Sequence, residues 1–271
     1  MDKLVVVKGG GDIATGIAHR LFRSGFKVLV TELSQPTVVR RTVAFAEAVY
    51  AGETVVEGVR AVRTSPAAVA EALGCGVVPV VVDPDGECRG RFDCLAVVDA
   101  ILAKKNTGTR REDAPIVIGV GPGFSAPADV HAVVETIRGH DLGRVIFEGS
   151  AAADTGIPGE IGGYTTERVL RAAADGVFVG RKTIGDRVEA GEAVGDVGGE
   201  PVLATIPGIL RGLLHDWLYV TAGFKVGDID PRCRQSHCYT ISDKARSVGG
   251  GVLEAIMALS AMRKNRRRGN A

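Results

Sequence analysis

Short apolar runs alternate with amphipathic stretches over the first two-thirds of the chain. The apolar runs predict strands at residues 4–8, 27–32, 77–83, 115–120 and 144–147. Residues 12–24 predict a helix, because Ile13, Ile17 and Leu21 recur four residues apart and share one face. Further helices are expected at residues 66–73, 92–103 and 128–138. This alternation favours a Rossmann-like, mostly parallel sheet with helices on both faces.

The pattern changes after a short helix expected at residues 167–174. The segment that follows is rich in Val and Gly, and it contains an internal repeat. GVFVGRKTIGDRVEAGEAVGDV (residues 176–197) aligns without gaps with GILRGLLHDWLYVTAGFKVGDI (residues 208–229), at an offset of 32 and with eight of 22 positions identical. Such a repeat indicates one supersecondary unit used twice.

A duplicated, glycine-rich β unit resembles the barrel-sandwich hybrid of biotinyl and lipoyl domains. Those carriers expose a modifiable lysine at the hairpin that joins their two halves. The corresponding joint here, GGEPVLATIPG at residues 198–208, contains no lysine. The resemblance therefore implies a small all-β barrel-sandwich module that is not a swinging-arm carrier.

The last segment, residues 241–263, returns to a helical pattern. Its part at residues 252–262 is apolar nearly all round, which is typical of a buried helix. We therefore expect a Rossmann-like α/β domain at residues 1–167, a duplicated β module at 175–232 and a C-terminal helix at 240–264. The helix is expected to pack either on the α/β domain or in a subunit interface, and the second alternative implies a homo-oligomer.

Composition excludes several classes of protein. The 271 residues are 45% hydrophobic and 24% charged, as in an ordinary globular protein, and a net charge of +1 gives no reason to expect nucleic acid. No apolar run reaches the length of a membrane span, and the first residues do not resemble a signal peptide. The five cysteines are odd in number and unevenly spaced, so we expect no disulfide framework and a cytoplasmic location.

A first glycine loop lies between the first strand and the first helix, at residues 9–14. Its spacing matches the G-x-G-x-x-G/A pattern, in which backbone N–H groups and a helix N-terminus hold a pyrophosphate. A carboxylate at the end of the second strand can accept a hydrogen bond from a ribose hydroxyl. The candidate residues here are Gly9, Gly10, Gly11, Asp12 and Glu32. Asp12 can cap the helix but would repel phosphate, and a turn without any dinucleotide remains the alternative.

A second glycine loop, with Gly121 and Gly123, follows the strand expected at residues 115–120. Ligands of open α/β sheets bind at the carboxyl ends of the strands, so two such loops would form a cleft for an extended, phosphorylated ligand. Polar candidates near these loops are Arg40, Lys104, Asn106 and Arg138. A sharp turn with no ligand is the alternative for this loop.

Two further groups of polar residues stand out. His131 and Glu135 are four residues apart on an expected helix and would share one face. They could be a base with its orienting group, half of a metal site or a surface pair. Cys233, His237 and Cys238 do not have a standard zinc spacing, so no metal site is expected. A reactive thiolate and a buried structural thiol are both open for Cys238.

Several long blocks together carry a family resemblance. They are GGGDIATGIAHRL (9–21), TELSQPTVVRRTVAFAEAVY (31–50), VVDAILAKKNTGT (97–109), GVGPGFSAPADVHAVVETIRGHDLGRVIFEGSAAADTGIPG (119–159), VTAGFKVGDIDPR (220–232) and ISDKARSVGGGVLEAIMAL (241–259). These blocks resemble the YqeB family, accessory proteins of selenium-dependent molybdenum hydroxylases. The resemblance implies a role in maturing the molybdenum cofactor or the hydroxylase that carries it, alongside Rossmann-containing chaperones of the XdhC type. It assigns no catalytic residues.

Three hypotheses follow. The favoured one is a maturation protein that binds a phosphate-bearing cofactor, with a molybdenum hydroxylase and its maturation proteins as partners. The second is an oxidoreductase that uses an NAD(P)-like dinucleotide, with Gly9, Gly11 and Glu32 holding the cofactor. The third is a non-enzymatic adaptor whose β repeat docks the hydroxylase. The expected cofactor is therefore a molybdenum cofactor or an NAD(P)-like dinucleotide.

Overall fold

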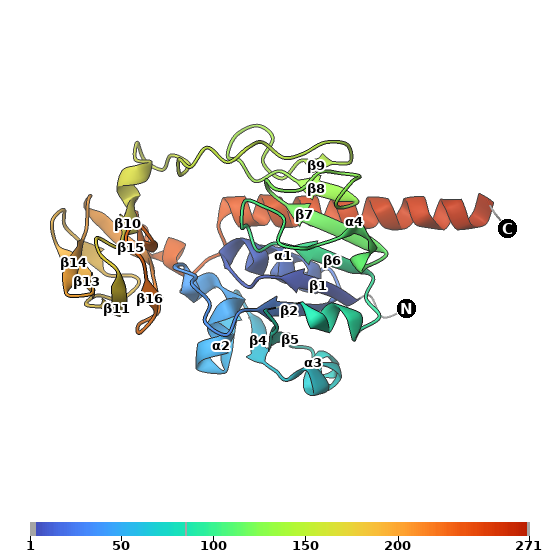
Figure 1. The fold of residues 1–271 in the computed structure, drawn as a ribbon, viewed down its shortest axis with the longest axis horizontal. Coiled ribbons are helices and arrows are strands. Elements are labelled where there is room, and N and C mark those ends of the chain that lie inside the picture. The colour runs from blue at the N-terminus through green and yellow to red at the C-terminus, as the bar shows by residue number, and fades with distance from the viewer. Residues whose placement is uncertain (1–3, 85, 270–271) are drawn as a thin grey trace.

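A large sheet with its helices and a smaller β module form two bodies that lie side by side (Figure 1). The computed structural model describes residues 4–84 and 86–269. We call the first body the sheet body, and we use the name β module for residues 169–230. The long segment between β9 and β10 runs from the sheet body to the β module (Figure 1).

The sheet of the sheet body has nine strands. In spatial order they are β3 (Glu53–Val56), β4 (Val59–Arg63), β5 (Val78–Val82), β2 (Lys27–Glu32), β1 (Leu4–Lys8), β6 (Ala96–Asp99), β7 (Ile116–Val120), β8 (Ala132–Val134) and β9 (Val145–Ile146). The strands from β4 to β8 pair in parallel, whereas β3 and β9 are antiparallel to their neighbours at the two edges. The sheet is therefore mixed.

Two long helices cover one face of this sheet. They are α1 (Asp12–Arg23) and α4 (Asp243–Gly269), and their apolar side chains share one core with Val5 and Val7 of β1. The alternate residues of β1, Leu4 and Val6, belong to a second core on the opposite face. Both faces of the strand are thus buried, which explains its continuous apolar run.

Among the described residues, the opposite face carries the short helix α3 (Val69–Gly74) and loops, and a further short helix, α2 (Ala48–Ala51), precedes β3. The helices expected at residues 92–103 and 128–138 are wrong, since β6 and β8 form there. Each segment contains a short apolar run, and in a strand buried on both faces such a run cannot be distinguished from a buried helix by periodicity.

The β module consists of two four-stranded antiparallel sheets. The first has the order β10 (Val169–Arg171), β17 (Lys225–Asp230), β15 (Gly208–Leu213) and β12 (Arg187–Val188). The second has the order β14 (Glu200–Leu203), β13 (Ala193–Val197), β11 (Gly176–Gly180) and β16 (Tyr219–Val220). A separate core of their inward-facing side chains, with Phe178 and Leu210 fully buried, lies within the module.

The internal repeat forms two equivalent sets of three strands. β11, β12 and β13 of the first copy correspond to β15, β16 and β17 of the second copy. The copies exchange partners, because β11 pairs with β16 and β12 pairs with β15. Neither copy therefore completes its own pairing without the other.

The fold class expected from the sequence is wrong in its layout. The large sheet is mixed, and its long helices lie on one face instead of both. In place of a compact barrel-sandwich module there are two separate antiparallel sheets, one of which includes β10 from outside the repeat. Hydrophobic periodicity identified several strands correctly but not the pairing at the edges, which depends on contacts distant in sequence.

Helix α4 runs along the sheet body next to α1 (Figure 1). Val252, Ala255 and Ile256 are fully buried, but Met257 and Met262 are about half exposed. The expectation that this helix is buried on all sides is therefore wrong. Among the described residues, no helix, α4 included, combines the length and the apolar character that crossing a membrane requires.

The two helices approach so closely that a glycine is required. A Cβ atom at Gly16 of α1 would lie 2.7 Å from the Cβ of Ala245 and 2.9 Å from its carbonyl oxygen. A Cβ atom at Gly249 of α4 would lie 2.9 Å from the carbonyl oxygen of Gly16. Gly250, the next residue of α4, has open space at the same position.

This contact predicts opposite effects of the same substitution at two helical glycines. Gly250→Ala should raise the free energy of unfolding by about 0.5–1 kcal/mol, because alanine restricts the unfolded chain and favours a helix. Gly16→Ala should lower it by about 1–3 kcal/mol, because the methyl group collides with the backbone of α4. Denaturant unfolding of both variants checks this, and a stabilised Gly16→Ala protein would show that the helices are not in close contact.

Candidate functional site

A cleft of about 1170 Å³ lies between the sheet body and the β module. Residues that follow β1, β6, β7 and β8 form one wall, at the carboxyl edge of the large sheet. Strands β10, β15 and β17 supply the opposite wall, and residues 152–161 of the connecting segment close one side. Ordinary ligand pockets measure about 300–1000 Å³, so this cleft has room for an extended ligand.

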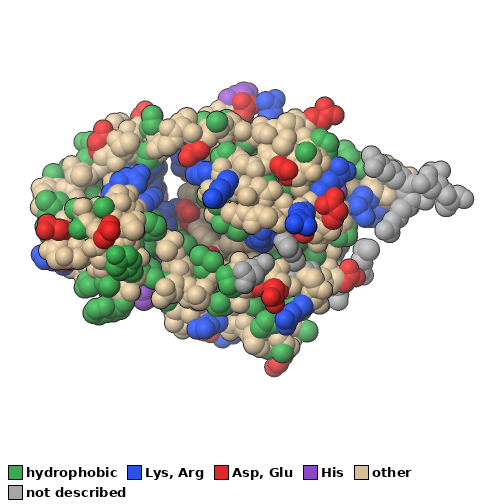
Figure 2. Space-filling model, in the orientation of Figure 1, with side chains coloured by type: hydrophobic (Ala, Val, Ile, Leu, Met, Phe, Trp, Pro, Cys, Tyr) green, Lys and Arg blue, Asp and Glu red, His purple; other side chains and the backbone are tan. Residues whose placement is uncertain are grey.

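The cleft is strongly cationic. Its basic residues are Arg40, Lys104, Arg138 and Lys244 of the sheet body, together with Arg168, Arg171, Arg211 and Lys225 on the side of the β module. Its acidic residues are Asp12, Asp154, Glu160 and Asp228. Figure 2 shows Lys and Arg side chains around the hollow between the two bodies. Because the whole chain has a net charge of only +1, this excess of four positive charges is a local feature of the cleft.

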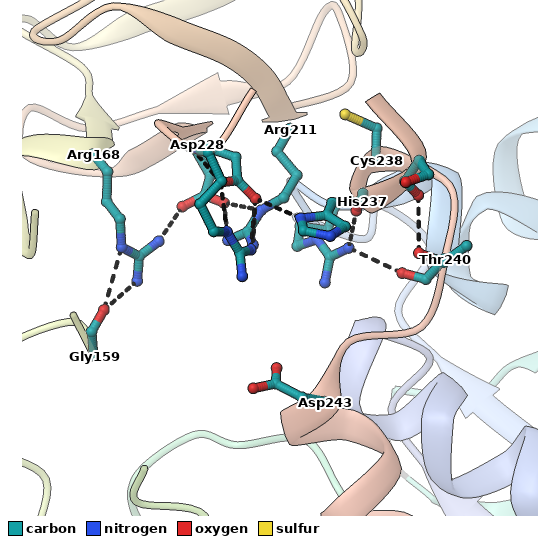
Figure 3. Close-up of polar contacts among 12 residues, drawn as sticks. Gly159, Arg168, Arg211, Asp228, His237, Cys238, Thr240 and Asp243 are labelled. Atoms are coloured by element: carbon teal, nitrogen blue, oxygen red, sulfur yellow. Dashed lines mark hydrogen bonds and ion pairs between the residues drawn. The ribbon is translucent and has the colours of Figure 1, made fainter. Parts of the chain in front are cut away.

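One buried carboxylate holds two arginines on the wall of the β module. Asp228 is 1% exposed and lies between Arg168 and Arg211 (Figure 3). Arg168 Nη1 donates to Asp228 Oδ1 at 2.5 Å, and Arg211 Nε donates to Asp228 Oδ2 at 2.7 Å. Burial lowers the pKa of Arg168, and repulsion from Arg211 acts in the same direction against the attraction of Asp228. Two guanidinium groups thus share this one carboxylate, and Arg211 Nη1 also lies 3.4 Å from Asp230 Oδ2.

The neighbouring Asp230 is fully buried and is paired mainly with Arg232, whose Nη2 donates to its Oδ2 at 2.7 Å. Burial by itself would raise the pKa of Asp230, but the hydrogen bonds from Arg232 and the charge of Arg211 hold it well below its usual range. Asp230 is therefore ionised and already used, which leaves little acidic charge for a further cation.

Arg40 connects the start of α1 with the segment before α4. Its Nη1 donates to Asp12 Oδ2 at 3.2 Å, and its Nη2 donates to the carbonyl oxygens of His237 at 2.9 Å and Thr240 at 3.3 Å. Its Nε is buried and has no hydrogen-bond partner among the described residues. Asp12 thus lies in the cleft as the acidic partner of an arginine.

Arg138 and Lys104 also have carboxylate partners. Arg138 donates two hydrogen bonds to Asp243, the first residue of α4, at 2.6 and 2.9 Å. These hydrogen bonds raise the pKa of Arg138 and hold that of Asp243 well below its usual range. Lys104 Nζ lies 3.2 Å from Asp154 Oδ1, and both side chains are about half exposed. An exposed pair of this kind contributes little to stability.

Two lysines of the cleft differ from these cations. The ammonium groups of Lys225 in β17 and Lys244 in α4 form no hydrogen bond or ion pair with any residue that the structure describes. Burial lowers the pKa of both. At Lys225 the charges of Asp228 and then of Asp12 oppose this effect, whereas at Lys244 the charge of Lys104 adds to it and that of Asp12 opposes it. Both side chains are half-buried. Unpaired ammonium groups with reduced access to water are unfavourable, so an anion in the cleft would stabilise them.

The first glycine loop does not line the cleft apart from Asp12. The N–H of Gly10 donates to Glu32 Oε2 at 2.7 Å, and its carbonyl oxygen accepts from the N–H of Ala46 at 2.9 Å. A Cβ atom at Gly10 would lie 2.9 Å from the nitrogen of Ala46. The segment around Ala46 therefore occupies the space against the loop, and Gly9, Gly10 and Gly11 lie outside the lining of the cleft.

Glu32 also lies outside the lining. Its second oxygen accepts from the N–H of Leu33 at 2.7 Å, so both carboxylate oxygens bind the backbone of the protein itself. Burial raises the pKa of Glu32, and these two hydrogen bonds oppose that effect. In this structure the carboxylate that was expected to hold a ribose instead fixes the turn after β1.

The second glycine loop is a pair of tight turns. Gly121 has φ +79° and packs against Thr136, and Gly123 has φ +108° and packs against the backbone of Lys105. Pro122, between them, lines the cleft. Asn106 uses its side chain within its own turn, since it donates to the carbonyl oxygen of Thr109 and accepts from the N–H of Gly108. Gly121, Gly123 and Asn106 lie outside the lining.

His131 and Glu135 do not share a helix face, because β8 forms between them. His131 Nδ1 accepts from the N–H of Val117 at 3.0 Å. Glu135 is buried and accepts hydrogen bonds from the N–H groups of Thr136, Ile137 and Ala152. It thereby fixes the two loops that form one side of the cleft.

Cys238 is buried and Cys233 is exposed. Burial raises the pKa of the Cys238 thiol. Neither cysteine lines the cleft. In the part of the chain that the structure describes, no three His, Cys, Asp or Glu side chains gather as a metal site would require.

The structure thus brings Asp12, Arg40, Lys104 and Arg138 together in one cleft. Sequence reasoning missed the cations of the β module and Lys244. The repeat contained a signal for two of them, because Arg211 and Lys225 replace Val179 and Ala193 of the first copy. Charges that appear at apolar positions of a repeat indicate that the second copy has a different task.

Comparisons with known proteins give one substantial match. No protein-family model matches the chain. It is similar to the uncharacterized protein YqeB of Escherichia coli (strain K12), with 51% identity over 258 residues, which are 95% of this chain and 48% of that protein. The chain therefore spans about half the length of this curated relative.

The similarities to solved structures are weak. An aspartoacylase family protein from Mesorhizobium loti is 10% identical over 86% of this chain and 87% of its own, with a TM-score of 0.27. The ectoine utilization protein EutE (DoeB) from Ruegeria pomeroyi is 13% identical over 84% of each chain, with a TM-score of 0.27. Scores this low carry no argument about fold or activity.

The match to YqeB extends over 95% of this chain, so it includes both bodies and the lysines and arginines of the cleft. Over the half of that relative that it spans, the 51% identity of the chain supports its membership of the YqeB family.

Proposed function

We propose that this chain is an accessory protein that binds a phosphate-bearing cofactor, a molybdopterin or a nucleotide, during the maturation of a selenium-dependent molybdenum hydroxylase. The observation that carries the binding is the cationic cleft, with eight basic and four acidic side chains and two lysines without partners. The resemblance of the sequence blocks to the YqeB family supports the hydroxylase system as the setting.

The residues of the cleft suit an anionic cofactor. Lysine and arginine side chains donate charge-assisted hydrogen bonds to phosphate oxygens, and partly buried cations are screened less by salt than exposed ones. A cleft of about 1170 Å³ also has room for the ring system that a pterin or a nucleotide adds to its phosphate. The chain's own residues would hold and orient the cofactor and exclude water from it.

The cleft offers binding groups and few catalytic ones. Neither cysteine nor histidine lines it, so the thiol of Cys238 has no place in the proposal as a selenium or sulfur relay. A carrier or chaperone needs affinity and orientation without a nucleophile. We therefore propose binding and transfer of the cofactor, with no chemical step on it.

The alternative of a dinucleotide-dependent oxidoreductase gains no support from the geometry. It needs a free glycine loop and a free carboxylate, and here Gly10 and Glu32 bind each other and the neighbouring backbone. The adaptor hypothesis predicts no small-molecule ligand, so the same binding experiments separate it from the proposal.

The proposal predicts that the natively purified protein retains a small phosphate-bearing molecule. Mass spectrometry should find a pterin or nucleotide after purification at low salt. A wash at about 1 M salt should release most of it, because the Debye length falls to about 3 Å at that ionic strength and charges farther apart no longer attract each other strongly. Absence of any pterin or nucleotide, together with no binding of either by calorimetry, would contradict cofactor binding and favour the adaptor.

A charge reversal on the wall of the cleft provides a matched comparison. Arg171 lines the cleft, is exposed and donates only to the carbonyl oxygen of Gly223, whereas Arg187 is an exposed arginine of the same module outside the lining. Arg171→Glu should weaken cofactor binding by about tenfold or more, which corresponds to about 1.4 kcal/mol, and Arg187→Glu should change it by less than about twofold. Equal effects in calorimetry would show that only the overall charge matters.

A further inference from the structure

We propose that Lys225 and Lys244 form the phosphate subsite of this cleft and that it takes a diphosphate group. The inference rests on the proposed function, because it specifies which part of the cofactor the cleft holds and where. It places the phosphate between β17 and the start of α4, away from the glycine loop at residues 9–11.

The other basic residues of the cleft already have partners within the protein. Arg168 and Arg211 share Asp228. Arg138 donates two hydrogen bonds to Asp243. Arg40 pairs with Asp12, and Lys104 pairs with Asp154. Arg171 donates to a carbonyl oxygen. Among the described cations of the cleft, Lys225 and Lys244 are thus the two whose charged groups have no hydrogen-bond or ion-pair partner in the protein.

The two lysines come from opposite walls. Lys225 belongs to β17 of the β module, and Lys244 lies in the first turn of α4 in the sheet body. Asp12 lines the same cleft, and its charge acts on the pKa of each lysine. The two lysines therefore belong to one cleft and not to two separate sites.

The position of the two lysines favours a diphosphate over a single phosphate. They come from different bodies of the molecule, on opposite walls of the cleft. A diphosphate offers one phosphoryl group to each lysine and reaches farther across the cleft than a single phosphoryl group. The chemical class of ligand is therefore a nucleoside diphosphate or a pterin joined to a nucleotide through a diphosphate.

The remaining cations support this position without competing for it. Arg168 and Arg211 lower the affinity of Lys225 for its proton, and Lys104 and Arg138 do the same for Lys244. An anion that binds to the two lysines is therefore also attracted by these neighbouring cations.

Calorimetry of the full chain with inorganic pyrophosphate and inorganic phosphate tests the inference. The wild-type protein should bind pyrophosphate at least about tenfold more tightly than phosphate. Lys225→Gln and Lys244→Gln should each weaken pyrophosphate binding by about ten- to a hundredfold, which is the effect of losing one charged hydrogen bond. Lys105→Gln, at an exposed lysine beside the cleft but outside its lining, is the control and should change binding by less than about twofold.

The charge-conserving variants Lys225→Arg and Lys244→Arg keep the test decisive if a glutamine variant does not fold, since they should retain most of the affinity. Unchanged pyrophosphate binding in both glutamine variants would overturn the subsite, and equal affinity for phosphate and pyrophosphate would overturn the diphosphate assignment. A protein that retains a pterin or nucleotide but ignores pyrophosphate would disprove the subsite alone. Pyrophosphate binding as described, without any retained pterin or nucleotide, would disprove the proposed function alone.

The pKa shifts predict a dependence on pH. Burial lowers the pKa of Lys225 and Lys244 below the ordinary 10.5, and only the protonated amines attract the anion. The ratio of wild-type to double-glutamine affinity should therefore fall as the pH rises through these lowered pKa values, at lower pH than an ordinary lysine would give. Using the ratio removes the titration of pyrophosphate itself, and a ratio that stays constant up to pH 10.5 would contradict the involvement of these lysines.

Discussion

The close approach of α1 and α4 determines where the residues of the cleft lie. The helices meet at Gly16, Ala245 and Gly249, where a side chain would collide with the opposite backbone. This contact lies about one turn from the start of each helix, so the first residues of both reach the cleft. Asp12 begins α1, and Lys244 follows the first residue of α4. A packing constraint between glycines therefore positions an acidic and a basic group that are far apart in the sequence.

The duplication supplies the opposite wall. Two copies of one β unit exchange strands. The copies share several glycines and an aspartate, which is Asp196 in the first copy and Asp228 in the second. In the first copy Asp196 pairs with Arg181 on the surface, whereas in the second copy Asp228 is buried with Arg168 and Arg211. The first copy thus has a surface ion pair, and the second has a buried cluster of cations on the side of the sheet body.

Local sequence patterns predicted the elements whose determinants are local. The strands β1 and β2 and the helix α1 form where the apolar spacing and the glycine at residue 25 indicate. The strands β6 and β8 were mistaken for helices, because a strand buried on both faces has no alternating pattern. The edges of the sheet and the exchange of strands between the repeats depend on distant contacts, which no window of sequence contains.

The candidate site was predictable to a similar extent. The edge of the sheet was identified, and Asp12, Arg40, Lys104 and Arg138 do line the cleft there. Glu32 and Gly10 follow a motif that usually binds a ligand, yet the chain places the segment around Ala46 on the loop. Lys225 and Lys244 belong to no sequence motif. They stand out because their ammonium groups have no ion-pair partner among the described residues of the folded structure.

The most direct measurement is an experimental structure of the natively purified protein with a diphosphate-bearing ligand. The account predicts phosphate density between Lys225 and Lys244, with the ligand's ring system extending along the cleft toward Arg138. Phosphate density at the N–H groups of Gly9, Gly10 and Gly11, with the segment around Ala46 displaced, would contradict it.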